Sequence, residues 1–238
     1  MGTIAGSKKL KRQMAPLFWG INRKNKRFAI TVTPGSHSKN RSIPTAILLR
    51  DVLKMVTTLR EAKSVIYNGK INVDGITRKS LHHSIGLMDV IELQGISDVY
   101  RLVPTHGHIL QPIKIDSSEK SKKIVKVTSK TTIRGKKTQL GFHDGRTIIA
   151  DSSVNIGDSC LIQIPEQKIL DVIKLEKDSL VIVTKGVNTG QVGHINNINE
   201  ATFTLSKRIN LTIDKKKFEM PADLVIVIGK EKPVIQIK

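Results

Sequence analysis

The sequence contains almost no cysteine, few aromatic residues and no long apolar run, and its first fifty residues contain no acidic side chain. A single cysteine, Cys160, excludes an internal disulfide and a metal site built from several thiolates of this chain. No segment approaches the roughly 18 apolar residues of a membrane span, so we expect no membrane partner. Eleven Lys or Arg precede the first acidic residue, Asp51. This asymmetry indicates a polyanionic partner, because a field of one sign attracts phosphates.

The basic charge is concentrated in the first third of the chain. Residues 1–80 hold 17 basic and 3 acidic residues, which supplies +14 of the formal net charge of +20. A small domain of that charge density repels itself, so a partner should neutralise it in the working state. The candidate contacts in this N-terminal segment are Lys8, Lys9, Lys11, Arg12, Arg23, Lys24, Lys26, Arg27, His37, Lys39 and Arg41.

Aromatic residues make up only 3% of the chain, yet Phe18 and Trp19 are adjacent in the basic segment. One role for them is to pin this segment to a folded domain. The other is stacking on exposed bases of a nucleic acid, which places Trp19 among the candidate contacts.

Residues 42–69 have the pattern of two short helices packed head to tail. Ser42 is expected to cap the first helix. Thr58 and Glu61 have the spacing of a capping box at the start of the second, which should end at Asn68-Gly69. Arg50 and Lys54 lie one turn apart on the first helix and are candidate contacts.

A β-hairpin is expected next, because Asp74-Gly75 separates two alternating segments, 70–73 and 76–79. Residues 87–93 supply a returning strand. The helices, the hairpin and this strand predict a compact α+β module whose hairpin offers Lys70, Arg78 and Lys79 to a partner.

Beyond residue 106 the sequence consists of short Ile, Val and Leu runs separated by turns, which favours strands. The first runs predict a small antiparallel barrel or sandwich, and those from residue 180 predict a five-stranded SH3-like barrel. The glycines of 186–193 lack the Gly-Lys-Ser/Thr ending and the helix of a nucleotide P-loop, so we interpret them as a turn that allows close backbone approach. The candidate contacts in this half are Lys130, Arg134, Lys136, Lys137, Lys185 and Asn188.

In this order the motifs resemble the S-four-e family of small-subunit ribosomal proteins of archaea and eukaryotes, over essentially the whole chain. The residues that carry the resemblance are Leu10-Lys11-Arg12 with Ala15-Pro16 and Trp19, Pro34-Gly35 with His37, Lys39 and Arg41, Ile43-Pro44, Leu49-Arg50-Asp51-Val52-Leu53-Lys54, Val73-Asp74-Gly75 with Arg78, Gly86-Leu87-Met88-Asp89-Val90-Ile91, Tyr100-Arg101-Leu102, His143-Asp144-Gly145-Arg146, Thr184 to Gly193, and Val227-Ile228-Gly229-Lys230 with Lys232-Pro233.

The resemblance implies an α+β, mostly β chain in four parts. These are a basic N-terminal extension (1–42), an S-four-like RNA-binding module (43–105), a central small β domain (106–173), and a KOW SH3-like barrel with C-terminal strands (174–238). It implies a structural constituent of the small ribosomal subunit in the cytoplasm, which binds and stabilises ribosomal RNA and supports assembly and translation. The expected partners are that RNA and neighbouring small-subunit proteins, with no small-molecule substrate and no cofactor.

Two features depart from the family pattern. Residues 185–188 read Lys-Gly-Val-Asn where many members have a Gly pair and a basic residue, and Gln191 stands where Arg is frequent. The sequence ends at Ile237-Lys238 without the longer basic tail of eukaryotic members, which favours an archaeal protein.

Three alternatives compete with this interpretation. An RNA-modifying enzyme can carry an S-four-like module, but Asp144 beside Arg146 lies among small β modules too limited for a catalytic domain, so no catalytic residue is assigned. His82-His83 and His106-Gly107-His108 lack carboxylate or thiolate companions, so no metal site is assigned. A transcription or translation factor holding a protein partner through its KOW barrel should leave the basic N-terminal segment exposed, whereas a ribosomal component should order it inside RNA.

Overall fold

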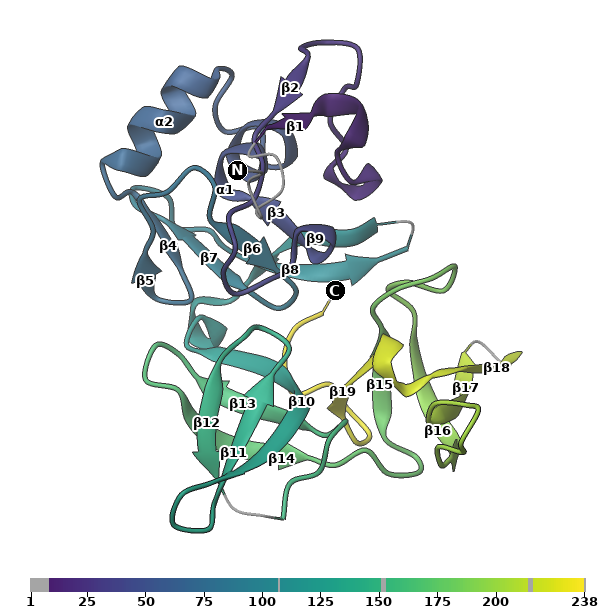
Figure 1. The fold of residues 1–238 in the computed structure, drawn as a ribbon. Helices are drawn as coiled ribbons and strands as arrows, with labels where there is room; N and C mark the ends of the chain where they lie inside the picture. Colours follow the sequence, from purple (N-terminus) through teal and green to yellow (C-terminus); the bar gives the residue numbers. More distant parts are fainter. Residues whose placement is uncertain (1–8, 107, 151–152, 214–215, 238) are drawn as a thin grey trace, which may run out of the picture.

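The computed structural model of the chain describes residues 9–106, 108–150, 153–213 and 216–237 (Figure 1). Strands account for 43% of it and helices for 14%, which confirms the prediction of a mostly β chain with few helices. The described part of the chain contains three five-stranded antiparallel sheets, which form its body. Within the described residues, no helix has the length and apolar character needed to cross a membrane.

The first sheet is built around the predicted hairpin. Asp74 and Gly75 both have positive φ angles at its turn, as a two-residue hairpin of this kind requires. The sheet continues to Ile115, so the predicted boundary between residues 105 and 106 falls inside its last hairpin. In spatial order its strands are β5 (Ile76–Thr77), β4 (Ile71–Val73), β7 (Val90–Leu93), β8 (Val99–Thr105) and β9 (His108–Ile115).

Of the two predicted helices, the second is confirmed and the first begins differently. Helix α2 (Leu59–Tyr67) starts with the capping box of Thr58 and Glu61. The prediction that Ser42 caps the first helix is wrong. Ser42 belongs to β3 (Ser42–Pro44), which pairs with β6 (Ser84–Gly86), and only then do the short α1 (Thr45–Ile47) and a π-type turn (Leu48–Val52) follow. A strand pairing across more than forty residues overrides the local cap signal here.

The N-terminal basic segment is packed against this module. Strand β1 (Leu10–Lys11) pairs with β2 (Phe28–Ala29), and Leu10, Ala15 and Trp19 belong to the same buried cluster as Ile47 and Ile71. Burial of these apolar side chains stabilises the segment against the module. Short 3₁₀ turns connect its parts at Arg12–Met14, Leu17–Trp19 and Lys39–Arg41.

The second sheet contains the central strands, and it is antiparallel throughout. The long β10 (Lys122–Ile133) crosses the middle of the sheet and pairs on both sides. A short 3₁₀ turn at Ser117–Glu119 leads into it. In spatial order the strands are β12 (Thr147–Ala150), β11 (Lys137–Phe142), β10, β13 (Ser159–Gln163) and β14 (Lys168–Ile173).

The third sheet has the five strands that the C-terminal sequence predicts. In spatial order these are β18 (Lys216–Pro221), β17 (Arg208–Ile213), β16 (Val192–Asn199), β15 (Leu180–Val183) and β19 (Val225–Gly229), with a 3₁₀ turn at Ala222–Leu224. The chain then runs back between the sheets toward the centre of the molecule (Figure 1). There the buried Arg101 guanidinium donates to the Gln236 carbonyl oxygen and pairs with Glu119 at 2.8 Å.

Buried apolar side chains connect the three sheets to one another. Val90, Val99 and Ile115 of the first sheet pack into the core of the second. Met88 and Val103 pack into the core of the third. These shared contacts hold the surfaces of the three sheets in one arrangement.

Candidate nucleic-acid interface

Most of the predicted basic contacts lie at the surface of the molecule. Lys8 lies outside the described residues. Arg50, Arg78, Lys130, Lys185 and Asn188 are half-buried. The exposed ones are Lys9, Lys11, Arg23, Lys24, Lys26, Arg27, Lys39, Arg41, Lys54, Lys70, Lys79, Arg134, Lys136 and Lys137.

The few acidic residues of the first third are already engaged inside the fold. Asp51 pairs with Arg50 at 2.7 Å. Glu61 accepts from the backbone amides of Thr57 and Thr58, and these bonds lower its pKa. Asp74 is buried in an ion network described below. Each of these three carboxylates already has a partner inside the fold, while the first eighty residues carry 17 basic side chains, so this part of the chain keeps a large excess of positive charge that a polyanion would neutralise.

A polar groove brings several of these cations together between the N-terminal segment and residues 50–59. It has a volume of about 390 Å³, and Lys26, Arg50 and Lys54 line it. Nearby, the Arg27 guanidinium lies 5.3 Å from the centre of the Phe28 ring. Phe28 is 44% exposed, so this strand presents an aromatic face together with a cation.

Two predicted contacts of the N-terminal segment are instead part of its internal structure. Trp19 is 1% exposed, and its indole Nε1 donates to the Ser42 carbonyl oxygen at 2.8 Å. It therefore pins the segment to the module and offers no face for a base. Arg12 is also buried, and its guanidinium donates to the carbonyl oxygens of Asn22 and Lys26. Among the aromatic residues described in this segment, Phe28 is the exposed one, and no local pattern in the sequence distinguishes it.

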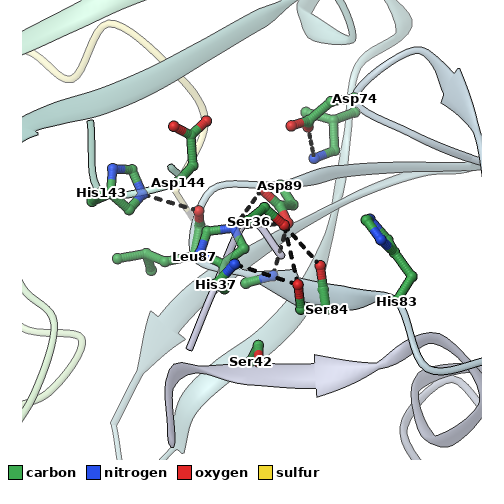
Figure 2. A network of polar contacts seen from close by, with 12 residues as sticks. Ser36, His37, Ser42, Asp74, His83, Ser84, Leu87, Asp89, His143 and Asp144 are labelled. Atoms are coloured by element: carbon green, nitrogen blue, oxygen red, sulfur yellow. Dashed lines mark hydrogen bonds and ion pairs between the residues drawn. The ribbon is translucent and has the colours of Figure 1, made fainter. Parts of the chain in front are cut away.

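His37 is a third correction, since it is buried and engaged with a carboxylate rather than exposed to a partner. Its Nε2 lies 3.1 Å from both oxygens of Asp89, and its backbone amide donates to the Ser84 hydroxyl. A Cβ at Gly86 would overlap the His37 ring, so glycine at that position makes room for it. Figure 2 shows His37, Ser84 and Asp89 joined by hydrogen bonds, with Asp74 and Asp144 nearby.

Lys123 is the centre of this buried network. Its side chain is 0% exposed, and its ammonium lies 2.7 Å from Asp74, 2.6 Å from Asp89 and 3.0 Å from Asp144. Arg146 closes the network from the second sheet, 2.6 Å from Asp74 and 3.3 Å from Asp144. Motif residues that are far apart in the sequence thus meet to join the first module to the second sheet.

The pKa values within the network follow from burial opposed by charge. Burial by itself raises the pKa of Asp89, but His37 and Lys123 outweigh it and the pKa is lowered. The pKa of Asp144 is likewise lowered, because Lys123 outweighs burial. Burial raises the pKa of Asp74, and the Asp89 carboxylate adds to this effect. Burial alone would lower the pKa of Lys123, but the three carboxylates raise it, so the ammonium is fixed in its charged form.

The remaining predicted contacts lie on turns of the second and third sheets. Arg134, Lys136 and Lys137 are exposed at the turn between β10 and β11, and Lys130 lies on β10 just before it. Lys185 and Asn188 lie on the loop between β15 and β16. A Cβ at Gly190 of that loop would overlap the backbone of Thr105, which supports the interpretation of a close backbone approach.

Two cations that the sequence did not single out line a large cavity beside this loop. Lys126 is buried on β10, and its ammonium donates to the carbonyl oxygens of Ala222 and Val225. Lys207 lines the same cavity and pairs with Glu200 at 2.9 Å. Among forty basic residues, sequence spacing carries no signal for these two, because the cavity forms only where the sheets meet.

Within the described residues, no three His, Cys, Asp or Glu side chains are placed to hold a metal ion.

Comparison with known proteins decides the family. The profile of ribosomal family S4e matches residues 96–169, and that of the RS4NT (NUC023) domain matches residues 5–40. The small ribosomal subunit protein eS4 of Methanothermobacter thermautotrophicus is 39% identical over 241 residues, which cover 100% of this chain and 98% of that protein. The chain belongs to ribosomal family S4e.

Other comparisons agree with this membership. The eS4 protein of Ignicoccus hospitalis is 38% identical to this S4e chain over 250 residues, covering 100% of the chain and 98% of that protein. The crystal structure of the 30S ribosomal protein S4e from Thermoplasma acidophilum matches with a TM-score of 0.69 and 33% identity, over 81% of this chain and 97% of that one. The S4e family consists of structural ribosomal proteins and not of enzymes.

Proposed function

We propose that this S4e protein is an integral constituent of the small ribosomal subunit in the cytoplasm, where it binds and stabilises ribosomal RNA and supports subunit assembly and translation. The observation that carries the proposal is the exposed basic surface of the first eighty residues, whose three carboxylates are all engaged internally. Neighbouring small-subunit proteins are further partners.

Each part of the chain predicted from the sequence contributes its own surface to the proposed RNA contact. The basic extension and the S-four-like module contribute the Arg27 and Phe28 face, the groove beside Lys54, and the hairpin with Lys70 and Lys79. The central β domain contributes the turn at 134–137, and the KOW barrel contributes the loop at 185–188. Because the three sheets share buried contacts, these surfaces approach RNA already fixed relative to one another, which reduces the entropy lost on binding.

The mechanism is electrostatic attachment combined with recognition of RNA shape. Each phosphate that a Lys or Arg neutralises releases counterions, so affinity falls with salt. Arginine adds two parallel hydrogen bonds to a phosphate where the geometry allows. Trp19, His37 and Arg12 contribute indirectly: their side chains hold the basic segment in place and do not themselves contact RNA.

The first test is sucrose-gradient fractionation of native lysate, with each fraction probed for this chain after washes of increasing salt. We expect stoichiometric presence in the small-subunit peak that resists the washes. Recovery only in light fractions, or release at modest salt, would instead indicate a factor that binds transiently.

A second test measures the salt slope of RNA binding directly. The triple variant Arg23→Gln, Lys24→Gln, Arg27→Gln removes three exposed cations of the N-terminal segment. If each contacts a phosphate, the slope of log K against log salt should decrease by about 2 to 3. The matched control is Lys174→Gln, Lys177→Gln, Lys217→Gln, which removes three exposed lysines outside the proposed surface. Equal slopes in the two triple variants would remove the N-terminal segment from the interface.

A further inference from the structure

A cavity of about 400 Å³ lies where the N-terminal segment and all three sheets meet. The cavity is lined by Arg41 of the N-terminal segment, Leu110 of β9 and Lys126 of β10. Lys185 of the β15–β16 loop and Ile226 of β19 complete this part of the wall. The volume is within the range of small-molecule sites. No single sheet needs this space for its own fold, since each sheet has its own buried core.

Cations converge on the cavity without a matching number of anions. The side chains of Arg41 and Lys185 make no ion pair or hydrogen bond within the described part of the chain. Lys126 is 7% exposed and uses two of its three donors on the carbonyl oxygens of Ala222 and Val225. Asp223 is the acidic residue among the described residues of the lining.

The pKa values of the two lysines show that burial and a neighbouring cation both disfavour their charged forms. The pKa of Lys126 is lowered to about 8, mainly by burial; Asp223 opposes this effect and Arg41 adds to it. Burial and Arg41 also lower the pKa of Lys185. Each ammonium is therefore held beside like charge in a partly desolvated place, and a bound anion would relieve both.

We propose that this cavity receives a single unpaired nucleotide of the bound RNA. Its phosphate lies against Arg41 and Lys185 at the rim, with the free donor of Lys126 directed to the same anion. The base and ribose lie against the apolar part of the wall, including Leu110, Ile109 and Ile226. An unstacked base held against apolar side chains while its backbone meets arginine is a general mode of RNA recognition. This assignment rests on the proposed function, because the nucleotide belongs to the same RNA.

The test uses the full chain with isotope-labelled isoleucine methyl groups, so that Ile109, Ile156 and Ile226 of the cavity wall report directly. The probe is adenosine 5′-monophosphate, compared with adenosine, inorganic phosphate and the dipeptide N-acetyl-Leu-Phe with a free carboxylate. The variants are Arg41→Gln and Lys185→Gln. Their matched controls are Arg60→Gln and Lys217→Gln, which remove the same charges from exposed positions outside the cavity.

We expect the nucleotide to shift the three methyl signals and to bind more tightly than adenosine or phosphate. Arg41→Gln and Lys185→Gln should each weaken it about tenfold, the effect of one hydrogen bond to a charged group, while the controls change it less than twofold. Absence of methyl shifts, equal affinities in variants and controls, or phosphate binding as tightly as the nucleotide would overturn the proposal. Stronger shifts with the dipeptide would overturn it in favour of an acidic protein segment.

Filter binding of the wild-type chain to small-subunit ribosomal RNA, measured in parallel, distinguishes failure of the cavity proposal from failure of the proposed function. RNA binding without a nucleotide response overturns the cavity assignment and leaves the proposed function in place. Absence of RNA binding overturns the proposed function itself.

Discussion

Replacing Lys123 with methionine should be among the most destabilising single changes in this protein. The substitution keeps the length of the side chain and removes the ammonium that touches Asp74, Asp89 and Asp144. All three carboxylates are at most 5% exposed, so water cannot replace the lost charge. His37 and Arg146 stay in place and compensate in part.

The expected loss is about 3 to 5 kcal/mol of the free energy of unfolding, the usual result of leaving buried charges without their partner. A domain of ordinary stability has roughly 5 to 15 kcal/mol in total. The matched control is Lys122→Met, because the Lys122 side chain is exposed one position earlier on the same strand. It should change stability by less than about 0.5 kcal/mol.

The difference between wild type and Lys123→Met should depend on pH. In the wild type the pKa values of Asp89 and Asp144 are lowered, so their ionised forms contribute stability above roughly pH 4 that is lost as pH falls further. Without Lys123 that contribution decreases, and Asp74, whose pKa burial already raises, is the first to take up a proton. The gap between the two proteins should be largest near pH 7 and should narrow toward pH 4.

Urea unfolding of both proteins at pH 7 and pH 4, followed by circular dichroism, measures these quantities. A loss below about 1 kcal/mol at pH 7, or a gap that widens on acidification, would refute the network as the connection between the module and the second sheet. If Lys123→Met does not fold, Arg146→Gln removes only the two ion pairs at the edge of the network. That variant should lose about 1 to 3 kcal/mol, and no loss would refute the same reasoning.

Three further predictions concern single side chains. Trp19→Phe leaves the Ser42 carbonyl oxygen without the indole donor, so it should lower the free energy of unfolding in urea by about 1 to 3 kcal/mol. The salt slope of RNA binding should stay the same. Weaker RNA binding at unchanged stability would contradict the internal role of Trp19. Burial raises the pKa of the Cys160 thiol to about 11, so a disulfide reagent at pH 8 should label the protein only after denaturation. Rapid labelling of the native protein would contradict the burial of this thiol. Because the pKa of Lys126 is lowered to about 8, the unfolded chain binds more protons than the folded one between about pH 8 and 10, so the free energy of unfolding should rise with pH across that window. Lys126→Met should flatten this rise. A pH profile that the substitution leaves unchanged would contradict the lowered pKa of Lys126.

Local signals in the sequence are strong for elements whose atoms are close along the chain. The capping box of Thr58 and Glu61 predicts the start of α2 because its hydrogen bonds span three residues. Asp74-Gly75 predicts the hairpin because the turn itself requires positive φ angles. The predicted cap at Ser42 was wrong, since strand pairing with Gly86 decides the conformation there.

By itself, the sequence determined the mostly β composition, the order of the strands along the chain and the concentration of basic charge in the first eighty residues. The tertiary structure alone decided that Trp19 and His37 lie inside, because side-chain identity does not reveal burial. It also decided the Lys123 network and the cavity beside Lys126, where groups more than thirty residues apart meet. Such long-range contacts depend on how whole sheets pack, and no local pattern in the sequence predicts them.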